Sequence, residues 1–220
     1  MAFENTGKSF VTLDWCLSYA TGATQWHGKK ITSVSEDRKI FYLYSEGNAS
    51  SLMIRIKGWL QYNGKNIKDI DGKFLLLDLK EYGLVSNGDI KLSKRNTEIL
   101  AKALKTKGIN QVDLFVIDTL NGFEEGEENS NTDCANFLNN LGYLNRTFDS
   151  NSLIVHYAGN NSLNKPIEEI RPRGASALSG RVTNTVIIKG DALKGFELYN
   201  RSRDIESTIL KQLKVKGFTD

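Results

Sequence analysis

The stretch that decides the fold is VDLFVIDTLNGFEEGEEN, residues 112–129. Its apolar run ends at Asp118 and Thr119, and the chain then passes through Asn121 and Gly122 into an acidic loop. This pattern predicts a buried strand that delivers one carboxylate to its carboxyl end. Parallel α/β sheets bind ligands at that edge, but many strands end in an acid for solubility alone. Asp118 therefore indicates a ligand site only if other segments of the chain supply binding groups at the same edge.

The composition is that of a single soluble domain. The chain has 220 residues, of which 40% are hydrophobic and 25% are charged, and we treat residues 1–220 as one domain. The net charge of +3 neither demands nor excludes nucleic acid. No apolar run approaches the ~20 residues that a membrane span needs. The first residues lack a basic region followed by an apolar core, so we expect a cytoplasmic protein.

Cysteine and histidine are too sparse for a metal cluster. Cys16 and Cys134 lie far apart and belong to no CxxC pattern, so we expect two reduced, buried thiols. The only histidines are His27 and His156, and we therefore expect no zinc site.

Hydrophobic periodicity predicts an alternation of helices and strands. The expected helices cover residues 8–20, 49–62, 97–107, 133–148 and 173–181. The expected strands cover residues 40–44, 74–77, 112–118, 152–156, 182–189, 195–200 and 205–216, with a turn at Gly190-Asp191. Residues 79–93 are expected to be irregular, and residues 158–172 form a polar loop. This order predicts an α/β fold: a mostly parallel sheet with helices on both faces and an antiparallel carboxyl-terminal edge.

The amino terminus carries half of a phosphate-binding loop. Gly7-Lys8-Ser9 matches the end of the pattern G-x-x-x-x-G-K-[ST], in which backbone N–H groups and the lysine bind phosphates and the hydroxyl binds Mg²⁺. The first glycine is replaced by Ala2, and no strand precedes the loop. Either the amino terminus is truncated, or Met1 is a start codon inside a longer gene. The alternative is a chance match in a surface turn.

Two further polar residues end predicted strands. Glu46 follows the strand 40–44, where a carboxylate could activate the water that attacks a γ-phosphate. His156 ends the strand 152–156, where it could sense that phosphate. Each is also an ordinary choice for a solvated strand end. Because parallel strands end at one sheet edge, we expect Glu46, Asp118 and His156 to converge beside Lys8.

With these motifs in place, the chain resembles the RecA-like AAA-domain ATPases of plasmids and phages, which are typified by the hexameric replicative helicase of broad-host-range plasmids. The matching segments are GKSFVTLDWCLSYATG, WHGKK, FYLYSEGNASSLMIRIKGW, LFVIDTLNGFEEGEENS, LIVHYAG and RPRGASALSG. They occur in the family's order. They cover a core of about residues 5–190, and a hairpin and tail follow at about residues 182–220.

The resemblance implies ATP and Mg²⁺ as cofactors and a role for each motif residue. Glu46 would be the catalytic carboxylate, His156 the γ-phosphate sensor, and Arg173 an arginine finger supplied to a neighbouring subunit. Asp118 and Ser9 would bind Mg²⁺. The nucleotide would be held by residues Asn5, Thr6, Gly7, Lys8, Ser9 and Phe10. Arg201 and Arg203 resemble basic residues of the family's carboxyl-terminal hairpin that can face a neighbour's nucleotide.

Two loops are the candidates for contact with nucleic acid. The loop 124–128 is acidic, whereas the loop 158–172 carries Lys165 and Arg171, which could track single-stranded DNA but have no aromatic stacking platform. The chain also departs from the family, with Tyr157 where a second histidine is common and Asn121 where a basic residue is common.

The resemblance therefore implies a RecA-like ATPase that forms a homo-oligomeric ring, possibly a hexamer, and acts on single-stranded DNA. We expect a helicase or translocase of plasmid or phage replication. The alternatives are an ATP-dependent switch or loader in DNA repair or regulation that separates no strands, and a truncated, inactive fragment.

Overall fold

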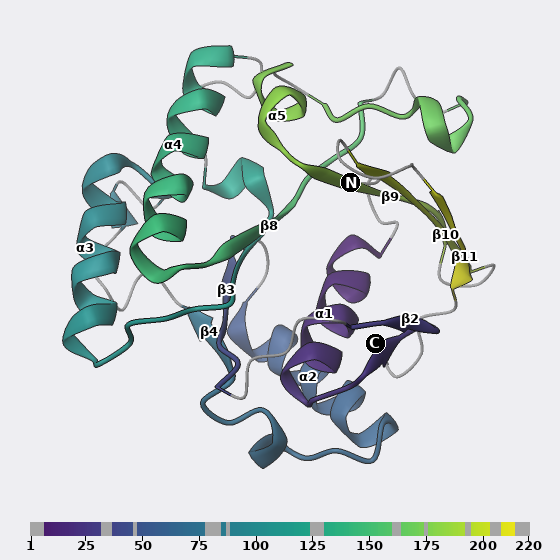
Figure 1. Cartoon of the computed structure of the whole chain (residues 1–220), viewed down its shortest axis with the longest axis horizontal. Helices are drawn as coiled ribbons and strands as arrows, with labels where there is room; N and C mark the ends of the chain where they lie inside the picture. Colours follow the sequence, from purple (N-terminus) through teal and green to yellow (C-terminus); the bar gives the residue numbers. More distant parts are fainter. Residues whose placement is uncertain are drawn as a thin grey trace.

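The structure is a computed structural model of the whole chain (Figure 1). It describes residues 7–31, 37–45, 48–77, 85–86, 89–123, 130–159, 164–173, 176–191, 195–202 and 208–213. The predicted site residues Asn5, Thr6 and Glu46, together with Arg203, lie outside these ranges.

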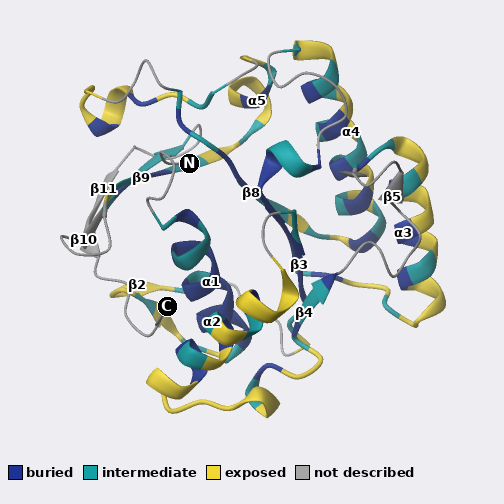
Figure 2. Ribbon diagram, turned by 180° about the vertical axis from the view of Figure 1, so that it is seen from behind, coloured by how far each residue is buried: buried dark blue, intermediate teal, exposed yellow. Residues whose placement is uncertain are grey.

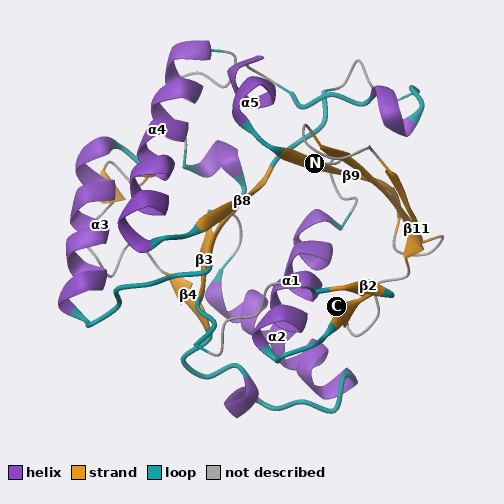
Figure 3. Ribbon diagram, viewed as in Figure 1, coloured by secondary structure: helices purple, strands orange, loops and turns teal. Residues whose placement is uncertain are grey.

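A parallel sheet of four strands forms the centre of the fold. Its strands are β3 (Ile40–Tyr44), β4 (Phe74–Leu77), β7 (Leu114–Asp118) and β8 (Asn151–Val155), in the order β4-β3-β7-β8. Figure 3 shows this sheet between α1 (Lys8–Ala20) and α2 (Ala49–Tyr62) on one side and α3 (Lys94–Thr106) and α4 (Asn131–Phe148) on the other. The predicted α/β, RecA-like architecture is confirmed.

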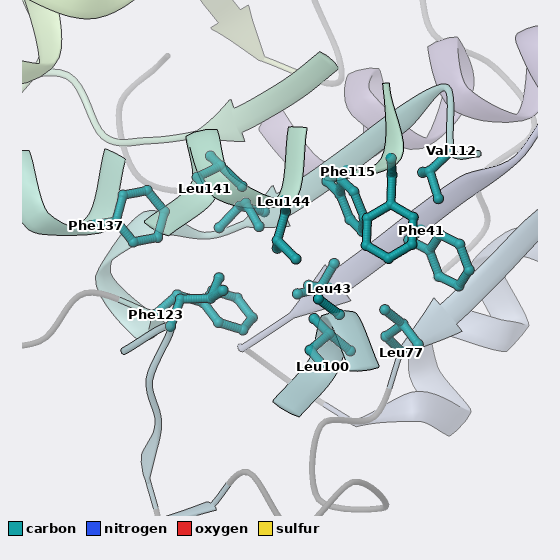
Figure 4. Close-up of a cluster of buried hydrophobic side chains, with 14 of the residues drawn as sticks. Phe41, Leu43, Leu77, Leu100, Val112, Phe115, Phe123, Phe137, Leu141 and Leu144 are labelled. Atoms are coloured by element: carbon teal, nitrogen blue, oxygen red, sulfur yellow. The ribbon is translucent and has the colours of Figure 1, made fainter. Parts of the chain in front are cut away.

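Alternation along the strands sends side chains to two separate cores. Phe41 and Leu43 of β3, with Phe115 of β7, pack against α3 and α4 (Figure 4). Ile117 of β7 belongs to the same cluster. The cluster there also takes in Leu100, Phe137, Leu141 and Leu144 from the two helices. The neighbouring positions Ile40, Tyr42, Leu114 and Val116 face α1 and α2, together with Leu13, Leu17, Ile56 and Trp59. Strands buried on both faces explain why the sequence runs are continuously apolar.

The burial pattern shows the same layers from behind. In Figure 2 the central strands β3 and β7 and the inner sides of the helices are buried, and the outer sides of α3 and α4 are exposed. Both cysteines are buried and free, as expected from the sequence. Among the described residues, no helix is long and apolar enough to cross a membrane.

Asp14 joins three elements on the α1 side of the sheet. Its carboxylate, which is buried, accepts hydrogen bonds from Trp59 Nε1 of α2 at 2.7 Å and from Trp26 Nε1 at 2.8 Å. His27 Nε2 lies 2.8 Å from the same carboxylate. Trp26 belongs to a small hairpin of β1 (Gln25–Trp26) and β2 (Lys29–Lys30), so one carboxylate ties this hairpin and α2 to α1.

The carboxyl-terminal strands form a sheet of their own. β9 (Asn184–Asp191), β10 (Gly195–Ser202) and β11 (Thr208–Leu213) are antiparallel in the order β11-β10-β9, and among the described strands none of them pairs with the parallel sheet. α5 (Ser176–Arg181) precedes them. The predicted turn at Gly190-Asp191 is wrong, because both residues pair within the hairpin, Gly190 with Phe196 and Asp191 with Gly195.

The remaining differences from the sequence prediction are local. α3 begins three residues before the predicted Thr97, because the Ser93 side chain caps the helix by accepting the Asn96 N–H at 3.1 Å. The region predicted to be irregular holds a short pairing of β5 (Val85–Ser86) with β6 (Asp89–Ile90). Short 3-10 helices cover η1 (Ile67–Asp69), η3 (Leu120–Gly122) and η5 (Ile167–Glu169), the last within the predicted polar loop.

Candidate active site

Asp118 lies at the carboxyl end of β7, in one row with Tyr44 of β3 and Val155 of β8. Its side chain points to the same face as Leu114 and Val116, which is the face covered by α1. The carboxylate is buried and accepts a short hydrogen bond from the Tyr42 hydroxyl. The structure therefore places this acid on the side of the sheet where the phosphate-loop helix begins.

The Tyr42 hydroxyl is held in its neutral, donating form. Burial raises the pKa of the Tyr42 phenol well above its usual value, and the charge of Asp118 and the hydrogen bond to it add to the rise. The nearby Arg55 guanidinium opposes the rise. Burial likewise raises the pKa of the Cys16 thiol, with further contributions from Asp118 and Asp14. Cys16 is therefore a structural thiol and not a nucleophile.

Ser45 fastens the end of β3 to the end of β7. Its N–H donates to the Asp118 carbonyl at 2.8 Å, and its Oγ accepts the Thr119 N–H at 3.1 Å. The peptide bond between Asp118 and Thr119 is cis. A Cβ added to Gly122 would lie 1.9 Å from Ser45 Cβ, so only glycine fits there. These contacts fix the residue that directly precedes Glu46.

Lys8 begins α1 at this same edge. Gly7 takes a left-handed conformation, with φ of 76°, and the helix follows at once. Lys8 is buried, and its Nζ lies 4.0 Å from the centroid of the Tyr157 ring. Ser9 and Phe10 occupy the first turn, and the Arg55 guanidinium lies over the Phe10 ring at 4.6 Å. First-turn N–H groups and the helix dipole favour an anion at this position.

His156 and Arg173 are joined within one chain. His156 Nε2 lies 2.7 Å from the Arg173 carbonyl oxygen, and the Arg173 N–H donates to the Tyr157 carbonyl at 3.0 Å. The Arg173 guanidinium carbon lies 6.0 Å from the Tyr157 ring centroid. The Tyr157 ring is therefore contacted by Lys8 and neighboured by Arg173. The structure thus brings Lys8, His156 and Arg173 together, and the supply of Arg173 to a neighbouring subunit stays a prediction.

Arg201 and Arg171 are held by backbone carbonyls of the η5 turn. Arg201 donates to the Glu168 carbonyl and, at 3.4 Å, to the Ile170 carbonyl. Arg171 donates to the same two oxygens at 2.9 and 3.2 Å. Burial lowers the pKa of Arg201, and the like charge of Arg171 adds to this shift. Arg201 therefore ties β10 to the turn, and its role toward a neighbour's nucleotide remains a prediction.

The donor set suits Mg²⁺ bound together with phosphate. Asp118 offers a carboxylate and Ser9 a hydroxyl, which are the hard oxygen ligands that Mg²⁺ prefers, and this ion usually takes its other ligands from water and substrate phosphates. Within the described part of the chain, no group of three or more His, Cys, Asp and Glu side chains could hold a metal by itself. This chemistry fits a metal that arrives with a nucleotide.

The residues that position these groups were not predicted from the sequence. Tyr42, Ser45, Arg55 and Tyr157 each contact or flank a predicted site residue. One signal was available for Tyr42. A tyrosine buried in a strand needs a hydrogen-bond partner, and strand alternation directs it to the same face as Asp118 if the two strands are neighbours.

Comparison with known proteins agrees with this geometry. A family model described as an AAA domain matches residues 1–162, which is most of the chain. The chain therefore belongs to the AAA-domain family, whose members are ATPases that bind nucleotide through a phosphate loop. No curated protein matches the chain at a significant level.

Proposed function

We propose that this protein is a ring-forming motor that hydrolyses ATP and moves along or unwinds single-stranded DNA in plasmid or phage replication. The observation that carries the ATPase part is the contact of Lys8, at the start of α1, with Tyr157, the residue after His156, while Asp118 stands opposite Val155 at the carboxyl ends of β7 and β8. Family membership supports nucleotide binding in general. The ring, the DNA and the replication role rest on the resemblance of the motifs.

In this proposal each residue has one task. Lys8 and the first-turn N–H groups of α1 bind the phosphates, and Ser9 and Asp118 hold Mg²⁺, which neutralises charge on the phosphates. Glu46 activates the attacking water, and His156 reports the state of the γ-phosphate to the segment around Arg173, to whose carbonyl it is bonded. Arg173 stabilises charge in the transition state, which in other nucleotide hydrolases contributes ~10³–10⁵-fold in rate.

ATP turnover tests the first part of the proposal. We expect Lys8→Ala to abolish nucleotide binding and Glu46→Gln to abolish turnover while ATP still binds. Lys102→Ala, which removes an exposed lysine of α3, is the matched control and should behave as the wild type. Full turnover in Glu46→Gln would remove Glu46 from the catalytic role.

A switch or loader is the second candidate, and one contact favours it. Arg171, a predicted DNA contact, donates its Nη1 hydrogen bonds to the carbonyl oxygens of Glu168 and Ile170 in the η5 turn. A displacement assay on forked DNA separates the two candidates. ATP-dependent strand separation supports the helicase, whereas DNA-stimulated hydrolysis without separation supports the switch.

A further inference from the structure

The outer sides of α3 and α4 (Figure 2) enclose a groove of about 440 Å³. Ala101, Lys102 and Lys105 line it from α3, and Tyr143 lines it from α4. Ala101 is buried and Tyr143 is 40% exposed, while both lysines are exposed. The groove therefore combines apolar side-chain surface with two ammonium groups in solvent.

This groove lies away from the edge of the sheet that carries the candidate active site. α3 and α4 lead into the amino ends of β7 and β8. Lys105 and Tyr143 lie toward the carboxyl ends of these helices, and hence toward the amino edge of the sheet. Lys8 and Asp118 lie at the carboxyl edge. An inference drawn from the groove therefore does not rest on ATP turnover.

The exposed side of α3 carries a stripe of positive charge. Lys94, Arg95, Lys102 and Lys105 are all exposed. A helix with 3.6 residues per turn places them within about 100° of one another around its axis and within about 16 Å along it. In the part of the chain that the structure describes, none of the four forms a salt bridge. α4 adds the exposed Arg146. A surface of this kind attracts an anionic partner by charge complementarity.

Glu98 distinguishes between two kinds of anionic partner. Its side chain is exposed, lines the groove and stands within the positive stripe, between Lys94 and Lys102. A nucleic acid strand carries a negative charge on every nucleotide, so its backbone would have to pass this carboxylate. A peptide can instead place an uncharged side chain opposite Glu98 and acidic side chains opposite the lysines. The charge pattern therefore favours a peptide.

We propose that the groove docks a segment of a partner protein in which acidic residues flank apolar ones. The apolar side chains pack against Tyr143 and Ala101, and the carboxylates pair with Lys102 and Lys105. Interfaces commonly combine an apolar centre with a polar rim, and amphipathic segments bind in grooves between helices. Among the described residues neither lysine has a carboxylate partner, so this pairing breaks no existing ion pair.

The test titrates the fluorescein-labelled peptide Asp-Glu-Leu-Phe-Glu-Glu-Leu-Asp with the protein in the absence of nucleotide. We expect Lys102→Ala/Lys105→Ala to raise Kd roughly 2–30-fold, because two exposed ion pairs are lost, and binding to weaken between about 50 and 500 mM salt. The same peptide with serine in place of leucine and phenylalanine should bind roughly tenfold more weakly. The matched control is Lys57→Ala/Lys68→Ala, which removes two exposed lysines of α2 and η1 and should bind as the wild type. Thermal unfolding checks that each variant is folded.

Several outcomes would overturn the proposal. Equal Kd values for the wild type and Lys102→Ala/Lys105→Ala would place the peptide elsewhere, and no peptide binding at about 1 mM would exclude the docking site. Equal binding of the parent and serine peptides would reduce the surface to a general attraction between charges. Tighter binding of an oligothymidine of about twelve nucleotides, lost in the double variant, would assign the groove to nucleic acid. Self-association of the wild type that the double variant loses would assign it to a second copy. Absence of ATP turnover with peptide binding intact would count against the proposed function only.

Discussion

Lys8 Nζ lies 4.0 Å from the centroid of the Tyr157 ring, so the lysine of the phosphate loop and the residue after the predicted sensor histidine are in direct contact. The contact spans two elements that the sequence separates by most of the chain. An ammonium over an aromatic ring is attracted by about 0.5–2 kcal/mol, depending on desolvation. Tyr157 therefore pre-positions Lys8 at the edge where phosphate would bind.

We expect Tyr157→Ala to weaken ATP binding about 2–5-fold, because Lys8 loses the ring that holds it and must be ordered on binding. Tyr157→Phe keeps the ring and should bind ATP as the wild type does. Titration with a fluorescent ATP analogue measures both dissociation constants. Equal weakening in the two variants would show that the hydroxyl matters and the ring does not.

Tyr42→Phe tests the hydrogen bond to Asp118. The folded state raises the pKa of the phenol, so the stability from this group is fully present below the unfolded pKa of about 10 and is lost as pH rises from there toward the folded pKa. We expect the variant to be less stable by about 1–2 kcal/mol at neutral pH and the difference to shrink above about pH 10. Denaturant unfolding between neutral and alkaline pH measures this.

The control for that variant is Tyr62→Phe, which removes an exposed hydroxyl at the end of α2. Its free energy of unfolding at neutral pH should stay within about 0.5 kcal/mol of the wild type. A difference between wild type and Tyr42→Phe that does not change with pH would contradict the raised pKa.

Gly122→Ala tests the close approach to Ser45. The added methyl group would lie 1.9 Å from Ser45 Cβ, so the ends of β3 and β7 must move apart, at a cost of about 1–3 kcal/mol. We expect lower stability and slower ATP turnover, because Ser45 directly precedes Glu46. Gly180→Ala in α5 is the matched control, since its new Cβ meets nothing within 4 Å, and it should be neutral or slightly stabilising.

Asp14→Ala removes the acceptor that two indole N–H groups share. Hydrogen bonds to charged groups contribute about 1.5–3 kcal/mol each, so we expect a loss of roughly 2–4 kcal/mol and a change in tryptophan fluorescence as the β1–β2 hairpin separates from α1. Asp14→Asn keeps an acceptor oxygen and should lose less. Asp71→Ala, at an exposed position, is the control. Unchanged stability in Asp14→Ala would mean that the hydrogen bonds from the two indoles contribute nothing to the free energy of unfolding.

The sequence predicted those features that depend on local patterns. The bounds of α2 match the prediction, because Asn48 caps its start and Asn63-Gly64 follow its end. The strands β3 and β4 match because short apolar runs stand between polar turns. Asp118 stands opposite Val155 at the carboxyl ends of β7 and β8, and Lys8 contacts Tyr157, the residue after His156; their joint role at a nucleotide stays a prediction.

The features that were predicted wrongly or not at all depend on partners that are distant in the sequence. Gly190 favours a turn by its own conformational freedom, but pairing with Phe196 keeps it in β9. The contact of Tyr42 with Asp118 joins residues 76 positions apart and depends on how β3 is registered against β7. The contact between the Tyr157 ring and Lys8 likewise depends on how β8 is placed relative to α1. One sequence contains no direct signal for such registers.

The row formed by Tyr44, Asp118 and Val155 across β3, β7 and β8 sets a rule for changes in chain length. Inserting one residue within β7 would turn the Asp118 side chain to the face of α3 and α4, away from Lys8. The same insertion in a connecting loop would leave the row intact. An added residue in a connecting loop therefore keeps Asp118 on the Lys8 side of the sheet, whereas one added inside β7 would separate the carboxylate proposed to bind metal from the lysine proposed to bind phosphate.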